Sequence, residues 1–354
     1  MGNLFRMNSL FERELSVYPS EFKPSAAVSL RAASMEYLFC VCAEESDAVI
    51  FSEEPDAKFI ETMEKNLSSK LRYSAGWKKE FSGLLLKEWG DYYSLSEGKF
   101  LPDEEKIEKS RYLNSKFVQM LWKGSGIPME ICRSEDDLKN FALEYGYPFA
   151  LKEPLSFSGT GNRIFCSEKD LSRFSLNFEK GYLIEKWMER TEDVSGIFHS
   201  DEDGIRILDI TYMMIDHKGG YNGNLILSGK MPELSSVLLK KTEDLFWKKG
   251  IEYNGPFSVD CFSYRDKDGI KFHYFSEFNF RYSFGRIHSD IRRRRRFKGD
   301  SLLLFFKPED ISEEIIRKRF RENGKYSRAD LILLSPAEIR GQSLRNIPVY
   351  IELT

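Results

Sequence analysis

A predicted two-stranded hairpin around residue 268 constrains the fold of this chain more than any other feature. Its strands are expected at Phe257–Tyr264 and Ile270–Asn279, where apolar and aromatic residues dominate. Between them, Asp268-Gly269 is a strong signal for a two-residue hairpin turn. The chain is therefore expected to contain antiparallel strands here, and their register decides which side chains share a face.

Three oxygen-bearing side chains fall on one face of this hairpin. If Lys267 pairs with Ile270, Asp260 lies directly opposite Glu277, and Asn279 is two residues further along the same face. A four-residue loop would change the partners but keep all three on one side. Like charges at opposite positions cost up to about 1 kcal/mol, and more once water is excluded.

The residues around the acids decide between two interpretations. One is a solvated hairpin face with the acids at the surface. We favour the other, a partly covered cation site, because apolar side chains flank the acids on both faces. They are Val259, Cys261, Phe262, Phe275, Phe278 and Phe280. All-oxygen ligands select a hard ion, so Asp260, Glu277 and Asn279 are predicted to bind Mg²⁺, with Mn²⁺ as an alternative.

Arginines follow the hairpin in two groups. Arg281 lies two residues beyond Asn279 and Arg286 is close by, so either guanidinium is a candidate to hold a substrate carboxylate or a transferring phosphoryl group. Residues 292–296 are five consecutive arginines, a pattern also found on nucleic-acid or polyphosphate surfaces. Five consecutive helical positions spread over every face, and the net charge of the chain is -3. We therefore favour an acidic substrate or a solvated helix over a nucleic-acid partner.

A strand followed by a loop of small residues lies in the middle of the chain. The apolar run Phe149–Leu151 ends on Lys152 and is followed by Ser156, Ser158, Gly159, Thr160 and Gly161. Such a loop can bring backbone N–H groups to nucleotide phosphates, although a plain hairpin ending in a lysine is the alternative. A return strand is expected at Arg163–Cys166, so the loop would form a hairpin flap. The helix and the Gly-Lys-Ser/Thr of a Walker loop are missing.

Two further segments are candidates to bind a nucleotide. The apolar strand Tyr182–Ile184 runs into Glu185, Lys186, Trp187 and Met188, whose backbone groups and packing surface suit a base; an ordinary strand end is the alternative. Asp193 follows at a spacing from which a carboxylate can reach a ribose hydroxyl. Lys116 lies on a predicted helix with Leu113, Phe117 and Leu121, where a solvated lysine is the alternative.

Length and composition set the broad class. At 354 residues, the chain is long enough for two or three domains. It contains no apolar run near the eighteen or so residues of a membrane span, and its first thirty residues lack a signal-peptide pattern, so we expect a cytoplasmic protein. Its five cysteines lie mostly in apolar runs without a Cys-x-x-Cys, which favours reduced thiols. Strands predicted at Tyr37–Ala43 and Ala48–Phe51 indicate a small α/β domain before residue 105.

The order of these features resembles the ATP-grasp superfamily over roughly residues 107–290. The most specific piece is Glu277-Phe-Asn279-Phe-Arg281, in which Phe280 stands where a proline is common and no second acidic metal ligand follows Glu277. The resemblance implies a mixed α/β and α+β architecture: an ATP-grasp fold of two α+β subdomains, preceded by a small α/β domain. The expected divisions are residues 1–105 for the preceding domain, 106–190 for the lid with its helix, and 191–354 for the metal hairpin and a closing layer.

The resemblance also implies an activity. Lys116 and Lys152 would hold the phosphates of ATP, the flap would cover them, and the hairpin would carry one or two Mg²⁺ ions. A small-molecule or peptide carboxylate would attack the γ-phosphate to give an acylphosphate, which an amine or similar nucleophile then displaces. The alternatives are a non-catalytic nucleotide-binding protein and a phosphotransferase of the same fold. A homodimer is left open beside a monomer.

Overall fold

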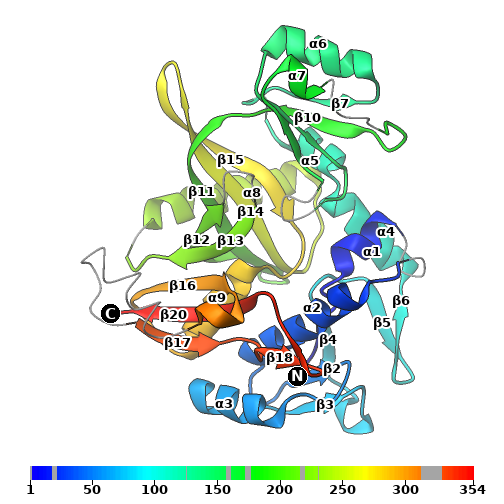
Figure 1. Cartoon of the computed structure of the whole chain (residues 1–354), viewed down its shortest axis with the longest axis vertical. Coiled ribbons are helices and arrows are strands. Elements are labelled where there is room, and N and C mark those ends of the chain that lie inside the picture. Colours follow the sequence, from blue (N-terminus) through cyan, green and yellow to red (C-terminus); the bar gives the residue numbers. More distant parts are fainter. Residues whose placement is uncertain are drawn as a thin grey trace.

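The computed structural model describes residues 2–17, 22–124, 126–156, 161–171, 177–215, 220–229, 231–311 and 329–354. Its largest element is an antiparallel sheet of eight strands (Figure 1) in the order β15-β14-β11-β12-β13-β16-β20-β17. In chain order, these strands are β11 (Glu189–Asp201), β12 (Gly204–Ile215), β13 (Tyr221–Ile226), β14 (Gly255–Asp266), β15 (Gly269–Asn279), β16 (Asp300–Phe306), β17 (Ala329–Leu333) and β20 (Ile347–Leu353).

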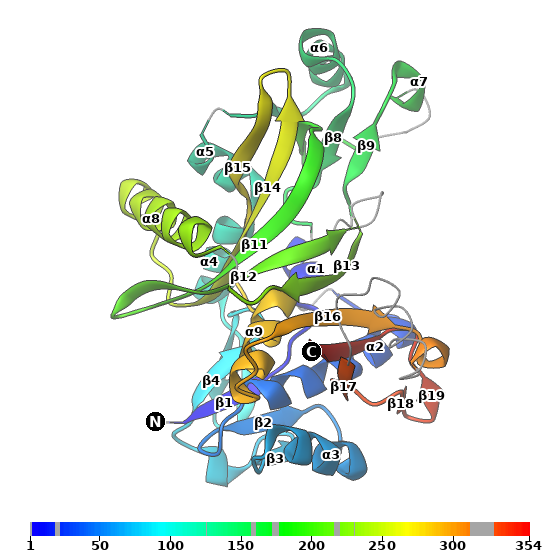
Figure 2. The ribbon, with the colours of Figure 1, turned by 90° about the vertical axis from the view of Figure 1, so that its left-hand side faces the viewer.

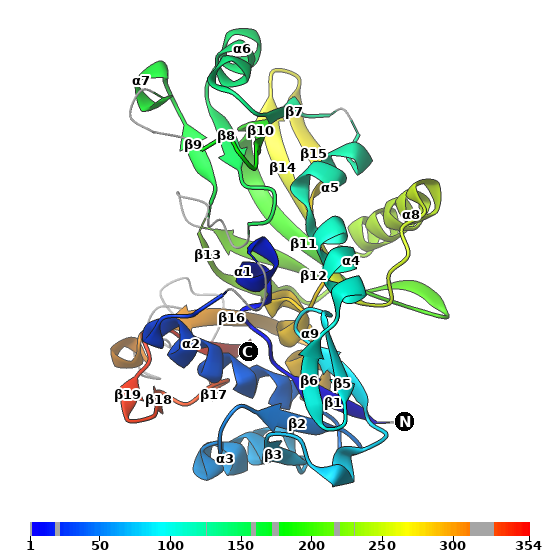
Figure 3. The same ribbon diagram turned by 90° about the vertical axis from the view of Figure 1, so that its right-hand side faces the viewer.

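The two faces of this sheet are covered differently. Helix α8 (Pro232–Lys249) packs through Leu238 and Phe246 on the apolar face, where Phe198 and Phe257 lie. Side chains alternate along each strand, so the residues next to these apolar ones point away from α8. Asp260, which follows the buried Val259, is one of them. Helix α9 (Phe284–Arg294) packs on that second face, between the sheet and the N-terminal domain (Figures 2 and 3).

A smaller sheet, which we call the lid, lies above one end of the large sheet, at the top of Figure 1. Its order is β7-β10-β8-β9, with β7 (Met129–Cys132), β8 (Phe149–Lys152), β9 (Arg163–Phe165) and β10 (Tyr182–Lys186). Strands β8 and β9 pair antiparallel, which confirms the predicted hairpin on either side of the small-residue loop. Helix α6 (Glu135–Tyr145) covers this sheet and is capped by Ser134, whose side chain accepts from the Asp137 N–H; α7 (Glu168–Leu171) follows β9.

The N-terminal domain holds a parallel sheet of order β3-β2-β1-β4. The strands are β1 (Asn3–Arg6), β2 (Ala48–Phe51), β3 (Tyr73–Ala75) and β4 (Leu85–Glu88); the other elements are α1 (Phe11–Ser16), α2 (Ala26–Glu36), α3 (Ala57–Leu67), η2 (Lys79–Phe81) and the hairpin β5 (Tyr93–Ser96) and β6 (Lys99–Pro102). The strand predicted at Tyr37–Ala43 is wrong: the segment is the 3-10 helix η1 (Tyr37–Val41). All five of its residues are buried, and a short apolar run buried on every side has no periodicity that separates strand from helix.

The C-terminal layer joins the large sheet to the N-terminal domain. Strands β16, β20 and β17 extend the sheet, and their apolar side chains share one core with the first ninety residues. The segment between β15 and α9 joins the same core, where Tyr282 packs against Phe39 of η1 with ring centroids 5.0 Å apart. The turn η3 (Pro308–Asp310) and the short pair β18 (Glu338–Ile339) and β19 (Gln342–Ser343) complete the layer. Within the described ranges, none of the helices combines the length and the apolar character needed to cross a membrane.

The central hairpin confirms the predicted face but corrects the predicted turn. The turn pairs Asp266 with Gly269, not Lys267 with Ile270. Gly269 adopts a positive φ of 118°, which lets it begin β15 directly after the turn. The register is irregular between the pairs Phe262–His273 and Asp260–Glu277, where β15 contains two residues more than β14. Beyond this irregularity, Asp260 lies opposite Glu277 as predicted. A shift by two residues keeps every side chain on its face.

The helix predicted around Lys116 is broken in two. Helix α4 (Glu104–Asn114) ends at Ser115, whose ψ of 122° is not helical, and α5 (Lys116–Trp122) begins at the next residue. The break allows the backbone N–H of Lys116 to donate to the Pro154 carbonyl at 2.9 Å, beside the small-residue loop. Lys116 therefore lies at the first position of a helix and is buried, not solvated.

Candidate active site

A cavity of about 650 Å³ lies between the lid and the large sheet; we call it the central cavity. Eight of the predicted site residues line it: Lys152, Trp187, Met188, Asp193, Asp260, Glu277, Asn279 and Arg281. Lys152 comes from β8 of the lid, and Trp187 and Met188 from the segment that joins β10 to β11. The others come from β11, β14 and β15 of the large sheet and, for Arg281, from the residues just after β15. The cavity thus joins the segments that the sequence suggested as the lysine side and the acid side of one site.

The acids of the hairpin lie as predicted. Asp260 is directly opposite Glu277, and Asn279 shares their face. The Asp260 carboxylate accepts from Ser195 Oγ at 2.7 Å and from Asn279 Nδ2 at 3.1 Å. Burial, followed by the nearby charge of Glu277, raises the pKa of the Asp260 carboxyl to about 6. A carboxylate whose charged form is disfavoured in this way is well suited to a cation.

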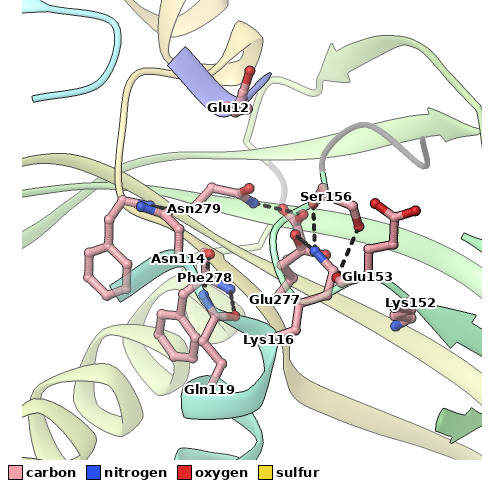
Figure 4. Close-up of polar contacts among 12 residues, drawn as sticks. Glu12, Asn114, Lys116, Gln119, Lys152, Glu153, Ser156, Glu277, Phe278 and Asn279 are labelled. Carbon is pink, nitrogen blue, oxygen red and sulfur yellow. Dashed lines mark hydrogen bonds and ion pairs between the residues drawn. The ribbon is translucent and has the colours of Figure 1, made fainter. Parts of the chain in front are cut away.

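Glu277 is bound by the lysine of α5 (Figure 4). Lys116 Nζ lies 2.8 Å from Glu277 Oε1 and donates to the Ser156 carbonyl at 2.6 Å. The lysine is 3% exposed, whereas the Glu277 side chain is 24% exposed towards the cavity. Burial raises the pKa of Glu277, but the positive charges of Lys116 and Lys152 outweigh it, so the pKa lies below its ordinary value.

Two buried amides hold this part of the site together. Gln119 of α5 donates to the Phe278 carbonyl at 2.8 Å and accepts from the Phe278 N–H at 2.9 Å. Asn114, at the end of α4, accepts from the Phe280 N–H at 3.0 Å. Strand β15 is the edge of its sheet, so these amides bind backbone groups that no neighbouring strand reaches. They therefore set the position of Lys116 relative to Glu277.

The lid contributes a second buried ion pair. Lys152 Nζ lies 3.0 Å from both carboxylate oxygens of Glu185, and the side chains are 6% and 3% exposed. Burial raises the pKa of Glu185, but Lys152, Lys123 and Arg190 outweigh it and hold that pKa at about 2. Burial also lowers the pKa of Lys123 to about 8. Three lysines thus surround the two glutamates between the lid and the hairpin.

The segment predicted to bind a base divides into two parts. Trp187 and Met188 line the central cavity, while Lys186 turns away and donates from Nζ to the carbonyls of Tyr145 and Tyr147. Glu185 is behind the cavity wall, bound to Lys152. Trp187 and Met188 therefore provide the apolar surface that a base requires. The side chains of Glu185 and Lys186 are instead held by contacts within the lid.

Asp193 lies in the cavity wall beside an arginine. Arg190 Nη1 is 2.8 Å from Asp193 Oδ1, and its guanidinium lies over the Trp187 and Phe262 rings. Arg190 thus links the carboxylate expected near a ribose to the aromatic surface expected near a base.

The two candidate catalytic arginines do not lie together. Arg281 lines the central cavity, and its Nε lies 2.5 Å from Glu12 Oε1, contributed by α1 of the N-terminal domain. The expectation for Arg286 needs correction, because its side chain is outside this cavity and binds Asp290 at 2.8 Å. Helix α9 begins at Phe284, so Arg286 is in its first turn and meets the residue one turn further on.

The loop residues are only partly described. Ser156 and Gly161 lie at its two ends, and a side chain at Gly161 would approach Glu153 to 3.0 Å. Ser158, Gly159 and Thr160 lie outside the described residues, so their predicted contact with phosphate stays a prediction.

Sequence reasoning missed several residues of the site. Ser195, Asn114, Gln119, Lys123 and Glu12 carry contacts or charges described above. Ser195 lies opposite Asp260 in the register of β11 and β14, a strand pairing that only the structure gives. The other four depend on the break between α4 and α5 or on the packing of the N-terminal domain.

The donor set of the hairpin fits a hard cation. Asp260, Glu277 and Asn279 can each offer an oxygen ligand, and a cation would stabilise the charged form of Asp260, whose pKa is raised by burial and then by the charge of Glu277. Over the described residues, no cluster of three or more His, Cys, Asp and Glu side chains has metal-binding geometry. Two carboxylates suffice for Mg²⁺, which usually keeps waters and phosphate oxygens among its six ligands.

Comparisons with known proteins agree with this geometry. No protein-family model matches the chain. Its sequence is 24% identical over 190 residues to the carbamoyl phosphate synthase large chain of Saccharolobus islandicus. The aligned region covers 51% of this chain and 17% of that protein. The chain therefore spans about a sixth of the length of the curated relatives it matches.

Solved structures match over the full chain. N5-carboxyaminoimidazole synthetase from Staphylococcus aureus in complex with ADP has a TM-score of 0.56 at 12% identity, covering 100% of this chain and 93% of that one. The biotin carboxylase domain of the 2-oxoglutarate carboxylase from Hydrogenobacter thermophilus has a TM-score of 0.52 at 15% identity, covering 100% and 86%. Both have the ATP-grasp fold, and so does this chain, as its sequence predicts.

Proposed function

We propose that this chain is an ATP-dependent ligase that joins a carboxylate to an amine or similar nucleophile through an acylphosphate. One observation carries the proposal: Lys152 of the lid lines the same cavity as Asp260, Glu277 and Asn279 of the hairpin. A triphosphate with its cation needs positive and negative groups on opposite walls of one cavity. The similar structures support this use, since they are complexes with ADP and, for the biotin carboxylase domain, with MgADP, ADP and bicarbonate.

The lysines and the arginine would bind the reactants. Lys116 and Lys152 would exchange part of their contact with Glu277 and Glu185 for phosphate oxygens. Arg281 would hold the carboxylate substrate through its planar guanidinium, which Glu12 orients from the N-terminal domain. Positioning and charge neutralisation supply most of the rate acceleration in phosphoryl transfer, so no covalent protein intermediate is required.

The hairpin would hold the cation. Asp260, Glu277 and Asn279 would bind Mg²⁺, which when bound neutralises charge on the β- and γ-phosphates. Ser195 and Asn279 orient the Asp260 carboxylate by their hydrogen bonds. The flap between Ser156 and Gly161 would exclude water from the acylphosphate. We also propose that residues 1–105, 106–190 and 191–354 act as three units, with the second closing on the third.

A screen for ADP release tests the proposal. Purified protein is given ATP and Mg²⁺ with pooled carboxylates, including bicarbonate, each with and without pooled amines. We expect release that depends on one acid and increases with one amine, and that stops when EDTA removes Mg²⁺. Turnover that survives in folded Lys152→Ala and Glu277→Ala variants would contradict the assignment.

The same screen separates the alternatives. Hydroxylamine traps an acylphosphate as a hydroxamate, so a ligase gives hydroxamate from its acid substrate. ADP release with a hydroxyl acceptor and without hydroxamate would identify a phosphotransferase. ATP binding without release under any condition would identify a non-catalytic nucleotide-binding protein.

A further inference from the structure

A second cavity, of about 600 Å³, lies on the other side of α9; we call it the arginine pocket. Six cationic side chains line it: Arg206 from β12, Arg286, Arg292 and Arg293 from α9, and Arg296 and Lys298 from the segment after α9. Helix α9 separates it from the central cavity, because Ser283, Phe284 and Gly285 line the central cavity and the later residues line the arginine pocket. Three of the five consecutive arginines (Arg292, Arg293 and Arg296) thus lie at a hollow that the proposed ligase reaction does not use.

The wall of this pocket contains more cationic side chains than carboxylates: six against two. The two carboxylates in its wall are engaged: Asp290 binds Arg286 Nε at 2.8 Å, and Asp209 accepts from Ser289 Oγ at 2.8 Å. Two of the cations have partners outside the wall, since Arg206 binds Asp201 at 2.6 Å and Arg293 binds Glu44 at 2.9 Å.

The remaining cations have no acidic partner in the described part of the chain: Arg292, Arg296 and Lys298. The side chains of Arg296 and Lys298 are exposed at the rim. Arg292 is held in place instead by two carbonyls, those of Lys298 at 3.2 Å and Gly299 at 3.1 Å. An anion entering the pocket would therefore displace no carboxylate from these three groups.

Two guanidinium nitrogens in the wall also need acceptors. Arg286 Nη1 and Arg292 Nε are buried from solvent, and neither has a hydrogen-bond partner among the described residues. A buried donor without an acceptor costs about 1–3 kcal/mol, and more when it is charged. Because both nitrogens are closed off from solvent, an anion in the pocket would act on them through its charge, and would make its direct contacts with the exposed groups of Arg296 and Lys298.

Two simpler explanations account for only part of this arrangement. Basic residues near a helix C-terminus are favoured by the helix dipole, which covers Arg292 and Arg293. It does not account for Arg206, which arrives from a strand. An extended nucleic-acid surface needs a basic track along the outside of the protein, whereas these six cations line a single hollow.

We propose that the arginine pocket binds a phosphorylated small molecule, at a site separate from the central cavity. Guanidinium groups match phosphate oxygens with two parallel hydrogen bonds, and several arginines suit a dianionic group better than a single carboxylate. Leu208 and Phe297 add apolar surface for an organic part. The size of the pocket, close to that of the central cavity, leaves room for a molecule as large as a nucleotide.

Calorimetric titration with inorganic pyrophosphate tests the proposal on the full chain. The first variant is Arg292→Gln with Arg296→Gln; the matched control is Arg31→Gln with Arg345→Gln, two exposed arginines outside the pocket. A third protein, Lys152→Met with Glu185→Leu, removes the phosphate-binding lysine of the lid in the central cavity. We expect pyrophosphate binding to weaken at least about tenfold, or 1.4 kcal/mol, in the first variant and to stay within about twofold in the other two.

Each other outcome decides against the site. No binding to the wild-type protein at millimolar pyrophosphate would overturn it, as would loss of binding in the Lys152 and Glu185 variant alone. Tighter binding of single-stranded DNA, weakened by the same substitutions, would show a nucleic-acid surface instead. If the first variant fails to fold in thermal unfolding, Arg296→Glu with Lys298→Glu replaces it, because both side chains are exposed and neither has a partner within the described ranges.

Discussion

The two cavities on either side of α9 hold their charges in opposite ways. At the central cavity, two of the three lysines each lie against a glutamate: Lys152 lies 3.0 Å from Glu185 and Lys116 lies 2.8 Å from Glu277. In the arginine pocket, six cations face two carboxylates, and five of the six come from residues 286–298. The central cavity therefore has paired charges and the arginine pocket has an excess of one sign.

This difference indicates what each cavity is suited to hold. A site for a triphosphate and its cation needs both signs in fixed places, because each charge must be stabilised while the other is absent. A site for an anion alone needs only an excess of positive charge. Paired charges also come from distant segments, so they depend on the complete fold, whereas a run of arginines carries its charge in any conformation.

The largest expected effect comes from breaking the buried pair of the lid. Lys152→Ala leaves Glu185 buried and unpaired, and we expect the free energy of unfolding to fall by about 3–5 kcal/mol. Lys152→Met with Glu185→Leu should recover most of this stability but no ATP turnover. Urea unfolding measures both, with the exposed Lys267→Ala as the control. A single variant as stable as wild type would show that the pair is not buried in solution.

Removing the hairpin acid tests the charge balance of the central cavity directly. Glu277→Ala is expected to lower kcat by about 10²–10³-fold, the size of effect seen when one electrostatic contact to a transition state is lost. Asp268→Ala, an acid at the exposed tip of the same hairpin, should leave turnover near wild type. Equal losses in the two variants would mean that the hairpin acts only through its fold.

Low pH should reduce the stability that the Lys152–Glu185 pair contributes. The pKa of Glu185 is about 2 in the folded chain against an ordinary value of 4.5, so its contribution to stability is complete above pH 4.5 and disappears as the pH falls towards 2. We expect wild type to lose on the order of 3 kcal/mol more than the Lys152→Met, Glu185→Leu protein over this window. Denaturant unfolding at a series of pH values measures the difference. If the unfolding free energies of the two proteins fell in parallel with pH, groups other than Glu185 would be responsible for the acid sensitivity.

A smaller effect is expected from the amide that positions Lys116. Gln119→Met removes the partner of both backbone groups of Phe278, which should cost about 1–3 kcal/mol. Turnover should fall about tenfold, because α5 then holds Lys116 less firmly against Glu277. Gln342→Met, at an exposed position, is the matched control. Full activity together with the expected loss of stability would remove the positioning role.

The smallest expected difference distinguishes the two arginines nearest the boundary between the cavities. Arg281→Ala should raise the KM for the carboxylate substrate about tenfold or more, and Arg281→Lys should recover part of the loss. Arg286→Ala should change that KM less, because its side chain faces Asp290 and the arginine pocket. Steady-state kinetics with the acid from the ADP-release screen provides the measurement. A larger rise of KM in Arg286→Ala than in Arg281→Ala would mean that Arg286, not Arg281, holds the carboxylate substrate.

Much of the site was readable because it lies on strands with a clear period. The face shared by Asp260, Glu277 and Asn279 followed from alternation alone, and it survived a turn that was predicted one position away from where it forms. The error was harmless because the irregularity in β15 shifts the register by an even number of residues. The strand that delivers Lys152 was identified for a similar reason, since a buried strand needs only a short apolar run.

The sequence by itself determined the hairpin and its acidic face, the strands on either side of the small-residue loop, and the resemblance that led to the fold. Only the tertiary structure decided how Lys116 reaches Glu277, that Glu12 of the N-terminal domain meets Arg281, and that Arg286 turns away from the central cavity. The physical reason is range. Alternation and turn chemistry act between neighbours along the chain, whereas these contacts join residues up to 269 positions apart and exist only once separate segments are packed together.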